Sequence, residues 1–185
     1  MADKKHSKLE YLSDLKKYEM ADDDPDVRDW DVYDAHDEKV GKVTGLLASP
    51  EREKIVYLDV EPLAELLPEN HNPFEADHEK GVHEYQDRKG NVRMIIPVGE
   101  AHVDRDKKVV IADGISTTTL KDYPTYRYRK DLPIHADYER QVRNRNRQVT
   151  LPKDEELKAG KEPEENYDTA DYDSDRFYGR KDSRT

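Results

Sequence analysis

The sequence contains no cysteine in its 185 residues, which excludes a disulfide framework and any metal site built from thiolate ligands. Hydrophobic residues are also scarce: they make up 34% of the chain, whereas 41% of the residues are charged. The formal net charge is −11. A chain of this length can hold one domain with a real core. Because this composition leans toward partial disorder, we expect one compact unit with solvated ends.

Long apolar runs are absent as well. No segment approaches the ~20 apolar residues of a membrane helix, and MADKKHSKLEYL at the N-terminus lacks the apolar centre of a secretory signal. We therefore expect a cytoplasmic protein with no membrane contact. Acidic residues outnumber basic ones two to one over residues 21–120, while residues 121–150 carry an excess of bases. The acidic body should repel nucleic acid, and the basic segment should attract it or dock on an acidic surface.

The apolar residues that are present concentrate in short runs with a period of two. VGKVTGLLA (40–48) and KIVYLDVE (54–61) flank the turn SPERE, which predicts a hairpin. Further strands are predicted within residues 29–34, 91–98 and 102–112. Turns rather than long helices separate them, which indicates a mostly β fold, a small antiparallel barrel or sandwich. Its predicted core consists of Val32, Val43, Leu47, Val56, Leu58, Val60, Ile96 and Val109.

Three segments lie outside the predicted barrel. In residues 1–23, leucines at three-residue spacing predict a short amphipathic helix, which must dock on another surface to be stable. Residues 121–150 are rich in tyrosine and arginine and are expected to pack on the barrel. Residues 151–185 are acid-rich and are predicted to form a disordered tail. The possible anchors of this tail are Tyr167, Tyr172, Phe177 and Tyr178.

Two groups of side chains are candidates for contact with a partner. The first is the leucine stripe Leu9, Leu12 and Leu15, and the second comprises Tyr123, Tyr126, Tyr128, Arg143, Arg145 and Arg147. The leucines either pack on their own barrel or bind a partner, and burial in a two-fold homodimer satisfies both interpretations. The second group either binds RNA by stacking and phosphate contact, or covers one end of the barrel and offsets its acidic charge. We favour the covering role, because the acidic body opposes the approach of nucleic acid.

A catalytic or metal site has less support in the sequence. Ser116 and Thr117–Thr119 have no partner histidine in a recognisable motif and are expected to end a strand and cap a turn. His71, His78 and His83 lie among acids, but their spacing matches no closed metal site, and a solvated acidic loop is the favoured interpretation. We therefore predict no catalytic, metal or cofactor-binding residue, and a protein that is not an enzyme.

The order of the strand motifs carries a family resemblance. The motifs are WDVYD (30–34), VGKV (40–43), YLDVE (57–61), IPV (96–98) and VVI (109–111). In this order they resemble the PRC-barrel domain, the small β-barrel of the photosynthetic reaction-centre H subunit, which also occurs in ribosome maturation factors. The resemblance implies an antiparallel PRC-type barrel over residues 24–120.

The segment DPDVR (24–28) is similar to the lead-in of free-standing soluble bacterial members, many of which are stress-associated. The chain departs from them at Asp29 and at Asp37-Glu38, where glycine is more usual. It also lacks the membrane helix of the H subunit, which argues against a reaction-centre role. The resemblance implies a stress-associated protein that acts through contacts with an unknown protein partner. The alternative is an RNA- or ribosome-associated factor.

Two acids acquire a possible role through the resemblance. In the H subunit, the acids matched by Asp59 and Glu61 lie near the proton route to a quinone. Without a membrane or a quinone partner, we expect Asp59 to be an ordinary outward-facing strand acid and Glu61 to be an acid at the strand end.

Overall fold

The computed structural model describes residues 8–17, 19–20, 24–74, 91–128, 134–147, 167 and 170–179. The strands, in chain order, are β1 (Glu10–Tyr11), β2 (Asp31–Asp34), β3 (Lys39–Ser49), β4 (Lys54–Pro62), β5 (Val92–Pro97), β6 (Ala101–Asp104), β7 (Val109–Ala112) and β8 (Tyr126–Arg127). The α-helices are α1 (Ala136–Arg147) and α2 (Ser174–Tyr178). The protein is therefore mostly β, as the sequence predicts.

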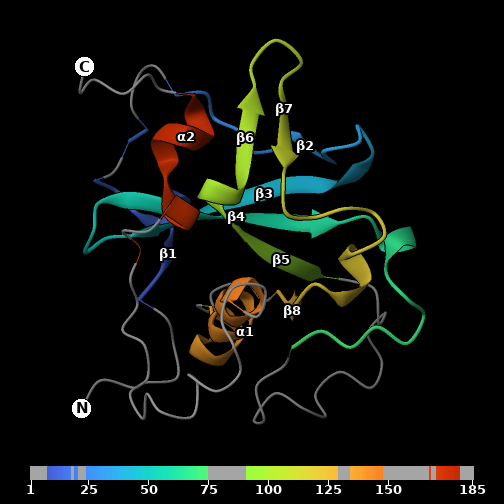
Figure 1. The fold of residues 1–185 in the computed structure, drawn as a ribbon. Coiled ribbons are helices and arrows are strands. Elements are labelled where there is room, and N and C mark those ends of the chain that lie inside the picture. The colour runs from blue at the N-terminus through green and yellow to red at the C-terminus, as the bar shows by residue number, and fades with distance from the viewer. Residues whose placement is uncertain are drawn as a thin grey trace.

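The strands form one mixed sheet in the order β6-β7-β2-β3-β4-β5-β8, and β1 pairs with β3 beside this path (Figure 1). Adjacent strands are antiparallel except for β2 and β7, which are parallel, with Asp31 opposite Val109. Among the described residues the path does not return to its starting strand. The expectation of a purely antiparallel arrangement is wrong at β2 and β7, because hydrophobic periodicity reveals the faces of a strand but not its neighbours.

The hairpin formed by β3 and β4 is confirmed. The register places Val43 opposite Val60, and Leu46 opposite Leu58, on either side of the turn at residues 50–53. A side chain at Gly41 would place its Cβ 2.4 Å from the carbonyl oxygen of Glu61. Glycine at this position therefore permits the close approach of the two strands.

The predicted N-terminal helix is wrong. Instead, β1 pairs with Leu47 and Ala48 of β3, and Leu12–Asp14 follows as a single 3₁₀ turn. Strand β3 has 11 residues and β2 only 4, so part of the β3 edge has backbone groups that β2 does not reach and β1 satisfies. Backbone pairing and the burial of Leu9 outweigh the helical preference of a segment too short to be stable as a helix.

Strand β4 lies at the centre of the sheet and is buried on both faces. Val56, Leu58 and Val60 point to one side and Tyr57 and Asp59 to the other, and none is more than 1% exposed. The second face is covered by segments from both ends of the chain, namely β1, α1 and the C-terminal residues (Figure 1). The sequence pattern therefore misleads in one respect, because both sets of alternating residues in β4 face packed protein.

The described part of the core contains every predicted core residue except Val109, which is half-buried. In β7 the buried residues are Val110 and Ala112, and Val110 lies opposite Val32 in the parallel pair. Because every residue of β7 is apolar, the sequence does not indicate which face of this strand points inward. The prediction chose Val109, whereas the neighbouring residue Val110 is the one that is buried.

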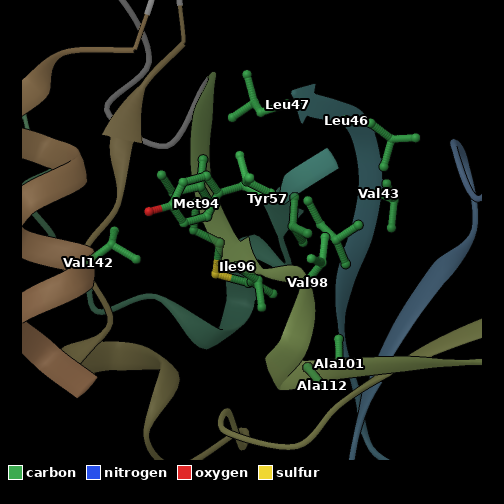
Figure 2. Packing of buried hydrophobic residues seen from close by; sticks show 14 of the residues in the cluster. Val43, Leu46, Leu47, Tyr57, Met94, Ile96, Val98, Ala101, Ala112 and Val142 are labelled. Carbon is green, nitrogen blue, oxygen red and sulfur yellow. The ribbon is translucent and has the colours of Figure 1, made fainter. Parts of the chain in front are cut away.

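Residues after 120 pack against the sheet. Tyr138 of α1 is fully buried, donates to the carbonyl oxygen of Pro124 and accepts from the backbone N–H of Ile95. Figure 2 shows Val142 of α1 facing the sheet residues Tyr57 and Met94. The helix therefore closes one side of the core through its apolar stripe.

The disordered-tail prediction is wrong for residues 170–179, which form a 3₁₀ turn and α2. The side chains of Tyr172, Phe177 and Tyr178 are buried, as is that of Tyr167. These four aromatic residues are the anchors that the sequence suggested, and their burial offsets the polar composition around them. The other residues of the predicted tail lie outside the described residues.

Candidate functional site

A cleft of about 620 Å³ opens between the N-terminal segment and strands β3, β4 and β5. Its floor is formed by Asp59 of β4 and Arg93 of β5, with Tyr128 beside them. Its rim carries the exposed acids Glu10, Asp14 and Asp29. The cleft exists because β1 runs along the edge of β3 and brings the N-terminal segment over the second face of the sheet.

Asp59 is the central residue of the floor and is only 1% exposed. The hydroxyl of Tyr126 donates to its Oδ1 at 2.8 Å, and the hydroxyl of Tyr11 donates to its Oδ2 at 2.9 Å. The two hydroxyl oxygens are 2.9 Å apart. The expectation that Asp59 faces outward is therefore wrong, whereas Glu61 at the end of the strand is exposed, as expected.

Arg93 supplies the positive charge at this site. Its Nη1 lies 3.6 Å from Oδ2 of Asp59, and its guanidinium lies 4.6 Å from the ring centroid of Tyr128. The side chain is 17% exposed, and its buried Nε forms no hydrogen bond within the described part of the chain. Arg93 is thus positioned both by a carboxylate and by an aromatic face.

Burial raises the pKa of Asp59, and this effect outweighs the opposing influence of Arg93 and of the tyrosine hydrogen bonds. Burial also raises the pKa values of Tyr11 and Tyr126, and the nearby Asp59 charge adds to the increase. Both tyrosines therefore keep their protons at physiological pH and act as donors. The cluster is a fixed set of donors around one buried carboxyl group.

The rim of the cleft has an excess of negative charge. Arg28 also lines the cleft and interacts with the charge of Asp29, but its guanidinium forms an ion pair with Asp26, which is not part of the lining. Among the described residues, Glu10, Asp14 and Asp29 form no ion pair. A cationic group at the rim of the cleft would thus meet carboxylates, whereas on the floor it would meet Arg93 beside Asp59.

A second buried polar cluster is centred on Glu139 of α1, which is fully buried. The hydroxyls of Tyr57 and Tyr167 donate to its Oε1 at 3.0 and 2.6 Å. The hydroxyls of Tyr57 and Tyr172 lie 2.9 Å apart, and Nε of Arg143 lies 3.9 Å from Oε1. This cluster connects the sheet, α1 and the C-terminal segment.

Most of the candidate interaction residues face the interior of the protein. Leu9, Tyr123 and Tyr126 are buried. Leu12, Leu15, Tyr128, Arg143 and Arg145 are half-buried, and the side chain of Arg147 lies outside the described residues. Arg145 stacks over Tyr123, with 4.4 Å between its guanidinium carbon and the ring centroid. The buried tyrosines Tyr123 and Tyr126 do not present a face on which a base could stack.

The serine, threonine and histidine candidates have structural partners. The Ser116 N–H donates to the Thr119 hydroxyl at 3.0 Å, and the Thr119 N–H donates to the Ser116 hydroxyl at 3.2 Å, which closes the turn. His71 Nε2 lies 2.6 Å from the Thr125 hydroxyl, and burial lowers the pKa of His71. His78 and His83 lie outside the described residues.

No group of three or more potential metal-ligating His, Asp or Glu side chains occurs in the part of the chain that the structure describes. No helix of that part is long and apolar enough to cross a membrane. No family model matches the chain, and no curated protein is significantly similar to it.

Sequence reasoning missed Asp59 as a site residue, although a signal was present. The acid lies within VYLDV, where each of the other four residues is apolar or aromatic, on both faces of the strand. Such a strand is typical of burial on both faces, and an acid in it needs hydrogen-bond donors. The donors come from Tyr11 and Tyr126, which are 48 and 67 residues away in the sequence.

Proposed function

We propose that this protein is a non-enzymatic binding protein that acts through protein–protein contacts, and that the acidic rim of the cleft receives a basic side chain of its partner. The observation that carries the proposal is the acidic rim, whose carboxylates form no ion pair among the described residues, above a floor of fixed polar groups. A lysine or arginine inserted from a partner would compensate this charge.

The geometry of the floor supports recognition rather than acid–base chemistry. Each oxygen of the Asp59 carboxyl accepts a hydrogen bond from a tyrosine, and Arg93 lies beside Oδ2. Groups held in this way lose little conformational freedom when a ligand binds, which favours affinity. A general base, by contrast, must be open to its substrate, whereas Asp59 is only 1% exposed.

The resemblance to PRC-barrel proteins is the basis for proposing a PRC-type fold and a stress-associated role. The motif strands 30–34, 40–43 and 57–61 fall in β2, β3 and β4, which are neighbours in the sheet, and 109–111 falls in β7 beside β2. This adjacency supports a PRC-type arrangement. A stress-associated role rests on the resemblance alone and is proposed on that basis.

The binding proposal can be tested with fluorescein-labelled hexalysine as a probe, measured by fluorescence anisotropy at low and high salt. We expect binding that weakens with salt and falls further in Glu10→Gln and Asp29→Asn. The matched control is Glu65→Gln, which removes an exposed acid elsewhere. Equal losses in all three variants would show that the probe senses only the total negative charge, and would refute the cleft as the site.

A single-stranded RNA probe in the same assay distinguishes this proposal from the alternative, an RNA- or ribosome-associated role. We expect no binding, because the acidic body repels phosphates. RNA binding that weakens steeply with salt and is lost in Arg127→Ala would instead favour an RNA-associated role. Arg127 is a suitable site because it belongs to the basic segment and is half-buried rather than part of the core.

A further inference from the structure

The C-terminal segment 167–179 occupies a surface formed by other parts of the chain. Its aromatic side chains are all buried, and Phe177 is fully so. The rings of Tyr167 and Tyr172 each pack edge-on against Tyr57, at centroid distances of 6.3 and 5.4 Å. We define the C-terminal groove as the surface that receives this segment on β4, β6, α1 and the 3₁₀ turn at 98–100.

The groove provides fixed anchors for the segment. Glu139 of α1 accepts from Tyr167, and the Lys54 ammonium donates to the carbonyl oxygen of Tyr167. At the other end, Arg105 donates to the carbonyl oxygen of Tyr178 at 3.1 Å. These anchors hold the two ends of the segment through its backbone as well as its side chains.

The segment is acidic, and basic side chains of the groove lie around it. The described part of the segment carries Asp171, Asp173 and Asp175 against the single cation Arg176. The groove contributes four basic side chains from three places in the chain, namely Lys54, Arg105, Arg143 and Arg145, together with the acids Glu100 and Glu139. A ligand of this groove is therefore an acidic peptide with aromatic residues at the spacing found here.

The segment has little regular structure that could persist without the groove. Helix α2 has only 5 residues, which is too short to be stable without docking. Residues 148–166 join α1 to Tyr167, and a connector of this length spans up to about 60 Å when extended. The segment can therefore reach its own groove or that of a second copy.

We propose that the C-terminal groove binds the segment 167–179 in trans, so that two copies of the chain exchange their C-terminal segments and form a two-fold dimer. Docking within one chain is favoured at low protein concentration by the high effective concentration of the tethered segment. Exchange is favoured when the protein is concentrated, since both arrangements make the same contacts. This inference does not involve the cleft above Asp59.

The test uses full-length protein and a fluorescein-labelled synthetic peptide of residues 165–180. The resident segment competes with the peptide, so the wild-type chain should bind it weakly. In Asp173→Ala the N-cap of α2 is lost, because Asp173 accepts hydrogen bonds from the N–H groups of Asp175 and Arg176. We expect this variant to bind the peptide about five-fold more tightly, since its own segment docks less well.

Asp106→Ala is the matched control, because it removes an exposed acid in the turn between β6 and β7. Its peptide affinity should equal that of the wild-type chain. A peptide carrying Phe177→Ala should fail to bind either protein, because Phe177 is the fully buried anchor. Circular dichroism of each variant confirms that it is folded.

The exchange itself is tested by sedimentation velocity of the full-length chain over a range of concentrations. We expect a dimer that grows with concentration and is converted to monomer by excess unlabelled peptide. If folded Asp173→Ala does not bind the peptide, the groove is not a binding site and the proposal is overturned. A chain that binds the peptide but stays monomeric would overturn the exchange. A dimer that resists the peptide must form through another surface and would also overturn it.

Discussion

Individual side chains in this protein show how burial changes the role of a polar residue. Asp59 and Glu61 are two residues apart in one strand, yet the first is buried under two tyrosines and the second is exposed. A buried carboxyl group is tolerated only where donors surround it. Tyr11 and Tyr126 therefore belong to the structure of the site as much as Asp59 itself.

The replacement Asp59→Ala should lower the free energy of unfolding by about 3–5 kcal/mol, because it leaves Arg93 and two tyrosine hydroxyls without their acceptor. Asp59→Asn retains an acceptor and should cost less. The control Glu61→Ala should change stability by no more than about 0.5 kcal/mol. Urea unfolding at neutral pH measures all three, and an equal effect at both positions would contradict the buried cluster.

Glu100 gives the protein a pH-dependent stability. Burial and the nearby Asp171 raise its pKa from about 4.5 to about 7, and Arg145 opposes them. Between these values the folded carboxyl group holds a proton that the unfolded chain has released. The free energy of unfolding should therefore fall as the pH rises from 4.5 to 7 and then level off.

The variant Glu100→Gln removes this titration, so the difference in stability between the variant and the wild-type chain should grow in favour of the variant over the same pH range. Chemical unfolding at several pH values provides the measurement. His71, whose pKa is lowered by burial, contributes the opposite slope to both proteins and cancels in the difference. A difference independent of pH would show that Glu100 titrates normally in the folded state.

At the level of elements, β1 shows what local sequence patterns cannot reveal. The spacing of the leucines around it suits a helix, but the unpaired edge of β3 selects an extended strand. The β3–β4 hairpin was predictable because its strands and turn are contiguous in sequence. The parallel pairing of β2 with β7 and the docking of α2 were not, since each depends on segments far apart in the chain.

The candidate site could be predicted only in part, for the same reason. The sequence indicated that Asp59 lies in a strand, but its burial depends on β1 and β8, which bring Tyr11 and Tyr126 to it. The aromatic anchors of the C-terminal segment could be recognised, because four aromatic residues are unusual in so polar a stretch. Their partner Glu139 could not, as an acid in a charged helix is normally exposed.

Replacing Tyr11 tests the strand assignment of β1. Tyr11→Phe removes the hydroxyl that donates to Asp59 and should cost about 1–3 kcal/mol of stability, because a buried acceptor loses a donor. Tyr33→Phe is the control, since Tyr33 is half-buried and its hydroxyl forms no hydrogen bond within the described residues. Thermal unfolding of the two variants should differ. Equal midpoints would indicate that Tyr11 does not reach the sheet.

At the scale of the whole molecule, the two ends of the chain cover the same face of β4. The N-terminal segment lies over Asp59 and the C-terminal segment over Tyr57, which are neighbours on that face. A strongly acidic chain with few apolar residues thereby buries its central strand completely. Contacts between segments so far apart in the sequence cost chain entropy when they form. The sheet must therefore supply most of the free energy of folding, and the chain ends dock on a sheet that is already stable.

If the sheet is stable and the C-terminal segment docks on it, substitutions in the sheet and in the segment should have different effects. Leu58→Ala opens a cavity at the centre of the sheet and should lower the stability of the whole protein by about 2–5 kcal/mol. Calorimetry should show one transition at a lower temperature, and amide exchange should accelerate in every strand.

Phe177→Ala removes a fully buried ring but should accelerate exchange mainly in α2 and its contacts, because the segment can detach while the sheet stays folded. If both variants accelerate exchange equally across the sheet, the C-terminal segment is an integral part of the core and cannot exchange between copies. An unchanged melting temperature for Leu58→Ala would contradict the central position of β4.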